Sequence, residues 1–197
     1  ALVSLLHPEL LLDLIRNFII YDNNVKKICR YKQYFAVKKC MKRILLQDGV
    51  DTRNGVVWHT QGSGKTITMI MLTKMILRES MKPGSSIKRP RFVMVTDRIN
   101  LDKQIRDNFI HTQMSPHRAK TGKGLIELLK EDGNTVITAL VNKFEAAVKQ
   151  EYCNDSENIF VFIDEGHRTQ YGKLNIYMNR VLPNAVKIAF TGTPLMQ

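Results

Sequence analysis

Two short polar runs carry residue types that phosphate chemistry requires, and the first is glycine-rich. It follows the apolar run 55–58 and precedes a stretch with helical character. Backbone N–H groups of such a loop can point at phosphate oxygens, helped by the N-terminus of the helix. The ammonium of Lys65 suits β- and γ-phosphates, and the hydroxyl of Thr66 suits Mg²⁺. The sequence therefore predicts a loop that binds a nucleoside triphosphate, formed by Gly62, Ser63, Gly64, Lys65 and Thr66.

This loop departs from the phosphate-loop pattern G-x-x-x-x-G-K-[ST] at one position. His59 stands where the first glycine belongs. The alternative interpretation is an ordinary Gly-Ser-Gly turn beside a lysine. The strand expected before the loop and the helix expected after it favour phosphate binding.

The second polar run follows the fully apolar stretch 159–163. Carboxylates at the C-terminal end of a buried parallel strand lie at the edge of the sheet where ligands bind. Asp164 is predicted to hold Mg²⁺ through water, and Glu165 to polarise the attacking water. His167 directly follows these carboxylates and is predicted to have a coupling role; the alternative is a polar residue that is simply hydrogen-bonded. The alternative is a solvated Asp-Glu turn, and the phosphate loop makes the hydrolytic interpretation the stronger one.

From residue 54 onward, strand-like and helix-like segments alternate. Short apolar runs occupy 55–58, 91–96, 135–138, 159–163 and 186–190, with helical stretches expected at 65–79, 99–110, 125–130 and 141–150. This alternation predicts an α/β fold of three layers, with a mostly parallel central sheet covered by helices on both faces.

Residues 1–48 are expected to be helical and to lead into the α/β part, which spans 49–197. An apolar stripe with helical spacing predicts the first helix, and a second is expected over 31–47; the stripe consists of Leu11, Leu14, Ile15, Phe18 and Ile19. The leucine-rich opening is interrupted by charged residues, so no membrane span is expected. The chain begins without Met and stops directly after a buried strand, which suggests a piece of a longer protein.

The composition favours a polyanionic partner. Lys and Arg number 30 against 18 Asp and Glu, a formal charge of +12. Neutralising phosphates with such cations releases counterions and drives binding, although a solvated basic surface is the alternative. The 3 cysteines form no C-x-x-C pair and are expected to be reduced thiols in a cytoplasmic protein.

Several motifs in order resemble those of a known family. "VVWHTQGSGKT", "VTDRINLDKQI", "FVFIDEGHRTQYG" and "AFTGTP" resemble motifs I, Ia, II and III of superfamily 2 helicase-like motors. Their combination more closely resembles the motor (R) subunit of type I restriction enzymes. "LLDLIRNFIIYDNNVKKICRYKQYFAV" is similar to the segment that leads into that motor. The resemblance implies the N-terminal RecA-like lobe of an ATP-dependent, Mg²⁺-dependent motor.

The resemblance also implies roles for residues around the nucleotide. Gln33 matches the glutamine that reads the adenine edge, with Arg30 or a nearby aromatic framing the base; the alternative is a surface residue of a helix. Thr191 and Thr193 match the motif that couples hydrolysis to movement on DNA.

Three further residues are implied in contacting the DNA backbone. Asp97 and Arg98 occupy motif Ia; the alternative for Arg98 is an ordinary cation at the start of a helix. Lys143 lies in "TALVNKF", which resembles the next DNA-facing motif. The expected partner is double-stranded DNA, held through phosphates without base recognition. In the family, separate modification and specificity subunits complete the restriction complex.

The same resemblance implies that this chain is incomplete as an enzyme. It lacks the family's upstream acidic-lysine nuclease site and the second lobe with its arginine finger. We therefore expect weak ATP binding and poor hydrolysis by this piece alone. The alternatives are a strand-separating helicase of the same superfamily, or a non-catalytic module that binds nucleotide or DNA. A GTPase is disfavoured because "VNKFE" carries Glu145 where guanine reading requires Asp.

Overall fold

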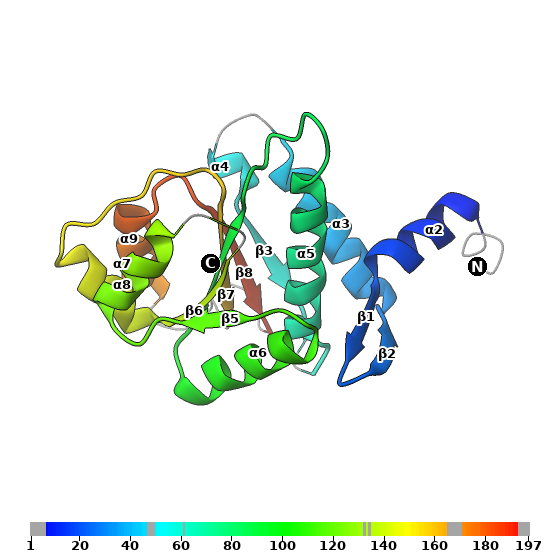
Figure 1. Ribbon diagram of the computed structural model, residues 1–197, viewed down its shortest axis with the longest axis horizontal. Helices are drawn as coiled ribbons and strands as arrows, with labels where there is room; N and C mark the ends of the chain where they lie inside the picture. Colours follow the sequence, from blue (N-terminus) through cyan, green and yellow to red (C-terminus); the bar gives the residue numbers. More distant parts are fainter. Residues whose placement is uncertain are drawn as a thin grey trace.

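A six-stranded parallel sheet forms the centre of the computed structural model, which describes residues 7–46, 50–60, 62–131, 133, 135–164 and 171–192 (Figure 1). The order of its strands is β3-β8-β7-β4-β6-β5, and all neighbours run parallel. The strands are β3 (Gly55–Trp58), β4 (Arg91–Thr96), β5 (Pro116–Arg118), β6 (Val136–Leu140), β7 (Ile159–Asp164) and β8 (Val186–Thr191). The register aligns the C-terminal ends of β3, β8, β7, β4 and β6 along one edge of the sheet. For example, Trp58 lies opposite Thr191, and Asp164 lies opposite Phe190.

Helices cover both faces of this sheet, because successive side chains of each strand point to opposite faces. Phe160 and Phe162 pack into the hydrophobic cluster that includes α3 (Tyr31–Ile44), α5 (Lys65–Ser80) and α6 (Ile99–His111). Val161 and Ile163 pack into the other cluster, with α7 (Gly122–Lys130), α8 (Val141–Val148) and α9 (Tyr171–Val181). The expected three-layer, mostly parallel α/β fold is confirmed.

The N-terminal part is only partly helical. After α2 (Pro8–Asn17), the chain forms an antiparallel hairpin of β1 (Ile19–Asp22) and β2 (Val25–Ile28). The expectation of a helix running through Ile19 was therefore wrong. Asn23 and Asn24 have φ of 49° and 63°, and two successive residues with positive φ make the tight turn that matches the twist of a two-stranded hairpin.

Two further segments differ from expectation. Residues 116–118, for which no strand was expected, form the edge strand β5, and α9 was not predicted at all. The short helix α4 (Val50–Arg53) precedes β3.

Within the described residues no helix is both long and apolar enough to span a membrane. The three cysteines are free thiols.

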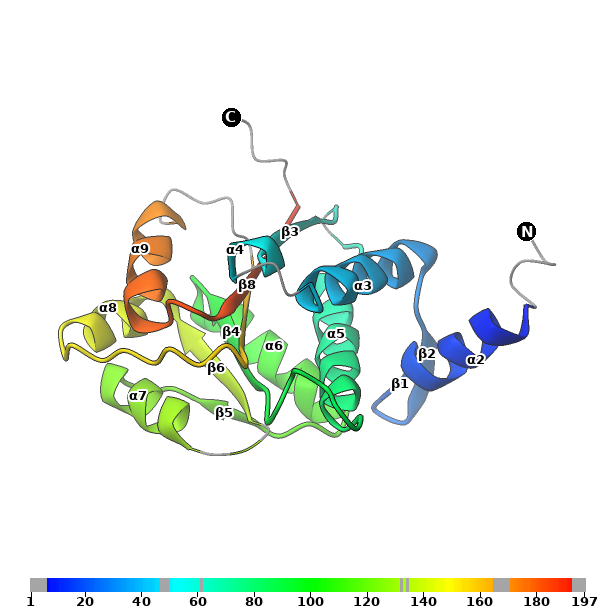
Figure 2. The ribbon, with the colours of Figure 1, turned by 90° about the horizontal axis from the view of Figure 1, so that it is seen from above.

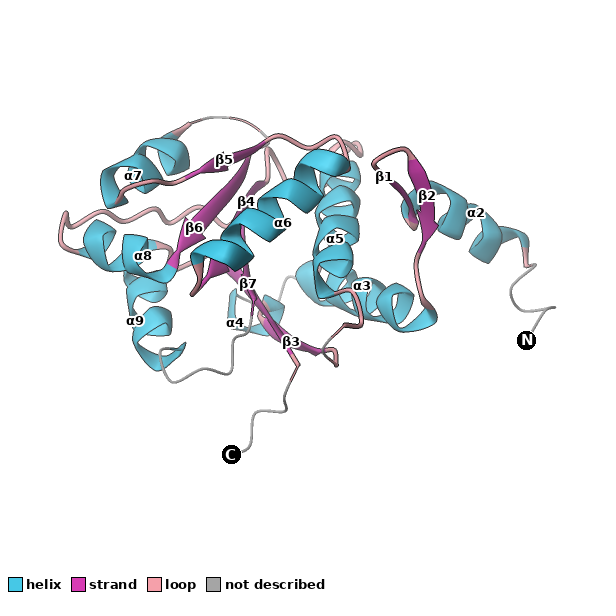
Figure 3. Ribbon diagram, turned by 90° about the horizontal axis from the view of Figure 1, so that it is seen from below, coloured by secondary structure: helices cyan, strands magenta, loops and turns pink. Residues whose placement is uncertain are grey.

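The N-terminal hairpin and α2 lie beside α3 and α5, at the end of the molecule away from α7, α8 and α9 (Figures 2 and 3). Phe18, between α2 and β1, is fully buried, and its ring lies 4.6 Å from that of Tyr34 on α3. The N-terminal segment is thus attached to the two helices that meet at the predicted phosphate loop.

Candidate nucleotide site

The predicted phosphate loop joins the end of β3 to the start of α5. Gly62 and Gly64 have φ of 76° and 84°, a left-handed conformation that other residues adopt only at a cost. Gly64 caps α5, which begins at Lys65. The positive end of the helix dipole and the N–H groups of the first turn therefore face the loop, and an anion is the ligand that such a helix start favours.

Gln33 lies against this loop and not on the surface. Its side chain is only 4% exposed, and its Nε2 donates to the carbonyls of Ser63 and Gly64, each at 3.2 Å. Its Oε1 accepts from the backbone N–H of Arg30 at 2.8 Å. The surface alternative is therefore wrong. The amide expected to read adenine is bonded to the phosphate loop, and its contact with a base stays a prediction.

His59, the residue that breaks the phosphate-loop pattern, is buried directly after the end of β3. It is 6% exposed, and its backbone N–H donates to the carbonyl of Thr191 at 2.9 Å. Burial lowers the pKa of its imidazole, as do the nearby cations Lys32 and Lys65, against the opposing effect of the Lys32 carbonyl. The ring is thus kept neutral next to the place where the phosphate loop begins.

The oxygen donors expected for Mg²⁺ come from two elements. Asp164 is the last residue of β7 and is half-buried, and Thr66 is in the first turn of α5. A carboxylate and a hydroxyl are the hard ligands that Mg²⁺ prefers, so the residues fit the ion. Among the described residues no three His, Cys, Asp or Glu side chains cluster as a metal site. A magnesium ion here would therefore complete its shell with phosphate oxygens and water, as is usual for this ion.

The coupling residues are placed only in part. Thr191 ends β8 between β3 and β7 and is buried. Its position links the phosphate-loop strand to the strand of Asp164. Glu165, His167 and Thr193 lie outside the described residues.

The candidate DNA contacts lie on the same edge but follow different strands. Asp97 and Arg98 come directly after β4, and Lys143 is in the first turn of α8, directly after β6. The guanidinium of Arg98 is 3.7 Å from the carboxylate of Asp97 and 58% of its side chain is exposed. The strand order thus brings together the phosphate loop after β3, Thr191 at the end of β8 and Asp164 at the end of β7. The exposed Arg98 and the half-buried Lys143 follow the next two strands, β4 and β6.

One ion pair between a buried carboxylate and an exposed guanidinium, which the sequence did not reveal, supports α6. The carboxylate of Asp102 is 1% exposed and lies 2.9 Å from the guanidinium of Arg118 on β5. A buried charge is costly unless paired, so this contact fixes α6 against the edge strand. Sixteen positions separate the two residues (118 minus 102). Asp102 lies within the run that resembles motif Ia, but nothing in that run points to Arg118, so no local pattern signals the pair.

Comparisons with known proteins agree with this architecture. Residues 32–197 match the SWI2/SNF2 ATPase family. The chain is 34% identical to the type I restriction enzyme HindI endonuclease subunit of Haemophilus influenzae, over 98% of this chain and 20% of that protein. It is 27% identical to the type I restriction enzyme SsaAORF53P endonuclease subunit of Staphylococcus saprophyticus, over 97% and 20%. The chain thus spans about a fifth of the length of these relatives.

Solved structures share the fold. The SWI2/SNF2 ATPase core of Sulfolobus solfataricus in complex with dsDNA superposes with a TM-score of 0.65 at 16% identity, over 92% of this chain and 34% of that one. A nuclease-deletion mutant of the type ISP restriction-modification enzyme LlaGI, in complex with a DNA substrate mimic, gives 0.61 at 17% identity, over 87% and 18%. The RecA-like fold and the resemblance to type I restriction subunits are confirmed.

Proposed function

Because this chain belongs to the SWI2/SNF2 ATPase family, we propose that it is the ATP-binding lobe of a motor that translocates double-stranded DNA in a type I restriction enzyme. The observation that carries the proposal is the left-handed Gly62 and Gly64 at the start of α5, with Gln33 bonded to the same loop. Sequence similarity to restriction endonuclease subunits supports the restriction setting.

The proposed chemistry is hydrolysis of ATP. Lys65 neutralises the β- and γ-phosphates, Thr66 and Asp164 hold Mg²⁺, and Glu165 orients the attacking water. Gln33 reads the adenine edge. His167, Thr191 and Thr193 couple hydrolysis to movement. Residues 1–48 form the lead-in and 49–197 the lobe, and a second lobe is required to supply the arginine that stabilises the transition state.

The proposed substrate is the backbone of double-stranded DNA in the cytoplasm. Arg98 and Lys143 contact phosphates, with Asp97 orienting Arg98 through the ion pair at 3.7 Å. No base is read, because a separate specificity subunit of the complex, which also contains modification subunits, reads the target sequence. On the full-length protein, movement along DNA without strand separation would distinguish this motor from a helicase.

A lysine variant tests the phosphate loop. Lys65→Ala is expected to abolish binding of fluorescent ATP and to leave DNA binding intact. Lys82→Ala is the matched control, since Lys82 is an exposed lysine beyond the far end of α5. Unchanged ATP affinity in the Lys65 variant would refute the assignment.

Salt dependence tests the DNA contacts. The logarithm of DNA affinity should fall linearly with that of salt concentration, and Arg98→Ala and Lys143→Ala should each reduce the slope by about one. The loss should be the same for unrelated DNA sequences. A flat salt response would mean that the charge of +12 is only a solvated surface.

A further inference from the structure

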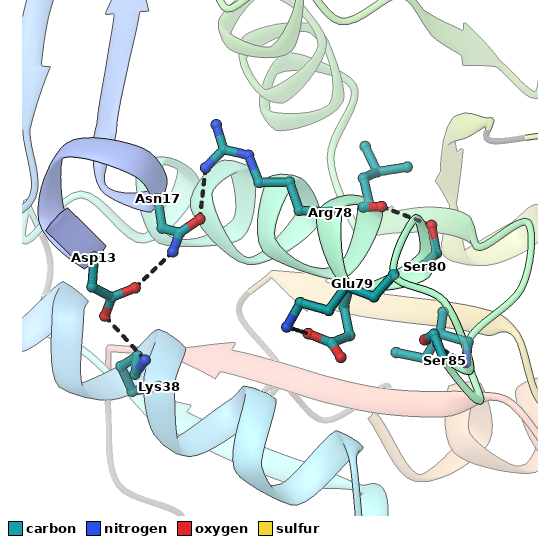
Figure 4. A network of polar contacts seen from close by, with 10 residues as sticks. Asp13, Asn17, Lys38, Arg78, Glu79, Ser80 and Ser85 are labelled. Atoms are coloured by element: carbon teal, nitrogen blue, oxygen red, sulfur yellow. Dashed lines mark hydrogen bonds and ion pairs between the residues drawn. The ribbon is translucent and has the colours of Figure 1, made fainter. Parts of the chain in front are cut away.

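Helix α2 holds two other helices through one partly buried hydrogen-bond network (Figure 4). Oδ2 of Asp13 accepts from the hydroxyl of Tyr34 and from the ammonium of Lys38, both on α3 and both at 3.0 Å. Oδ1 of Asp13 accepts from Nδ2 of Asn17 at 2.6 Å, and Oδ1 of Asn17 accepts from the guanidinium of Arg78 at 2.7 Å. Arg78 is in the last turn of α5, so α2 connects α3 with the far end of the phosphate-loop helix.

The helices held by this network meet again at the nucleotide site. Tyr34 directly follows Gln33 in the first turn of α3, and the amide of Gln33 donates to the carbonyls of Ser63 and Gly64. Asp13 therefore accepts hydrogen bonds from α3 at Tyr34 and Lys38, one and five positions after Gln33, the residue that contacts the phosphate loop. Any rotation or slide of α3 that broke the contacts with Asp13 would also move Gln33.

The protonation states of Tyr34 and Asp13 favour the hydrogen bonds of this network. Burial and the hydrogen bond to Asp13 raise the pKa of Tyr34 to about 12, so its hydroxyl remains a donor at neutral pH. Burial by itself would raise the pKa of Asp13, but the hydrogen bonds from Asn17, Lys38 and Tyr34 lower it below 3.8. Asp13 is thus an anion that accepts from three donors.

We propose that Asp13 is a positioning residue for the nucleotide base: by fixing Tyr34 and Lys38 on α3, it sets Gln33 against the phosphate loop in the orientation that reads adenine. This inference rests on the proposed function, in which Gln33 contacts the base and the loop of Lys65 contacts the phosphates. It assigns the segment before α3 a part in base recognition, although that segment does not touch the loop in the contacts described.

A ligand without a base separates positioning from stability. In the 197-residue chain, Asp13→Asn is expected to weaken ATP binding about fivefold, the equivalent of one lost hydrogen bond, and to leave tripolyphosphate binding unchanged, with Mg²⁺ present for both. Tyr34→Phe, which removes the hydroxyl but keeps the ring against Phe18, should act in the same direction. Glu9→Gln is the matched control, because Glu9 is an exposed carboxylate on the same helix.

The route through Gln33 is tested by combining variants. In a Gln33→Ala background, which should itself weaken ATP but not tripolyphosphate, Asp13→Asn is expected to have no further effect. The inference is overturned by unchanged ATP binding, by parallel loss of both ligands, or by a selective loss that persists without Gln33. ATP binding that survives Lys65→Ala would instead refute the phosphate loop, so the two failures are distinct.

Discussion

Gly64 allows a sharp test of the packing between the phosphate loop and α3. A Cβ at this position would lie 2.6 Å from Nε2 of Gln33, closer than any relaxed contact, and its backbone φ is +84°. Gly62 has nearly the same backbone, φ +76°, but a Cβ there would meet no atom within 4 Å. Gly64→Ala and Gly62→Ala therefore share the backbone strain and differ in the collision with Gln33.

The expected magnitudes follow from these two terms. A non-glycine residue in the left-handed region costs about 1–2 kcal/mol, and both variants are destabilised by this amount. Displacing the amide of Gln33 also breaks its hydrogen bonds to Ser63 and Gly64, at about 1 kcal/mol each. Gly64→Ala should therefore reduce the free energy of unfolding by about 3–4 kcal/mol, and Gly62→Ala by about 1–2 kcal/mol.

Urea unfolding of the ligand-free protein measures both values, and a double-mutant cycle isolates the collision. In a Gln33→Ala background, Gly64→Ala should cost only the backbone strain, giving a coupling energy of about 2 kcal/mol between the two positions. Equal destabilisation by the two glycine variants, or a coupling energy near zero, would refute the proposed contact. The result does not depend on any assumption about function.

Three other outcomes follow from buried groups elsewhere. Arg118→Ala should lower the free energy of unfolding by about 3 kcal/mol or more in urea titrations, because Asp102 is left buried without its charged partner. Exposed Cys153 should be alkylated well before Cys40 at neutral pH, as read by peptide mass spectrometry, because burial raises the pKa of Cys40 to about 11 and leaves little thiolate. Burial lowers the pKa of His59 below 6.5, so as the pH falls the unfolded state binds a proton at this residue before the folded state does. The free energy of unfolding should therefore fall as the pH drops below 6.5. His59→Gln should flatten this part of the pH dependence of unfolding.

Each of these has a control in the same chain. Lys123→Ala breaks a solvent-exposed pair at 4.0 Å with Glu127 and should cost under about 1 kcal/mol, so a similar value for Arg118→Ala would contradict the argument from the buried carboxylate of Asp102. Cys29, whose pKa is likewise raised to about 11 by burial and by Asp13, should react as slowly as Cys40. For His59, an identical pH profile in wild type and variant would show that its protonation is not linked to unfolding.

The sheet and the phosphate loop were predictable because their signals are local. Five of the strands are short apolar runs, and Gly-Ser-Gly-Lys-Thr between a strand and a helix has few other uses. The hairpin was missed because Phe18 and Ile19 continue the helical spacing of Leu11 and Ile15. Phe18 instead packs its ring against Tyr34 on α3, and such tertiary contacts override the periodicity.

Other features depend on residues far apart in the chain. Strand β5 has only three residues and no apolar pattern, and it forms because β6 offers an open edge. The pairing of Gln33 with the phosphate loop joins positions 30 apart, and that of Asp13 with α3 joins positions more than 20 apart. Motif resemblance implied a role for Gln33; Asp13 lies in the same similar segment, but no role was implied for it.

The position of β3 at the margin of the sheet has a consequence for the order in which the protein acquires its parts. Within the described residues, β3 pairs only with β8, and the contact from Asn54 to Lys187 spans 133 positions. Such long loops are the costliest to close, and a chain growing from its N-terminus cannot close this one until β8 has been made. The lysine of the phosphate loop is synthesised before β8 but gains its final support only after it, so a nucleotide that recognises the finished loop would report that β8 has joined the sheet.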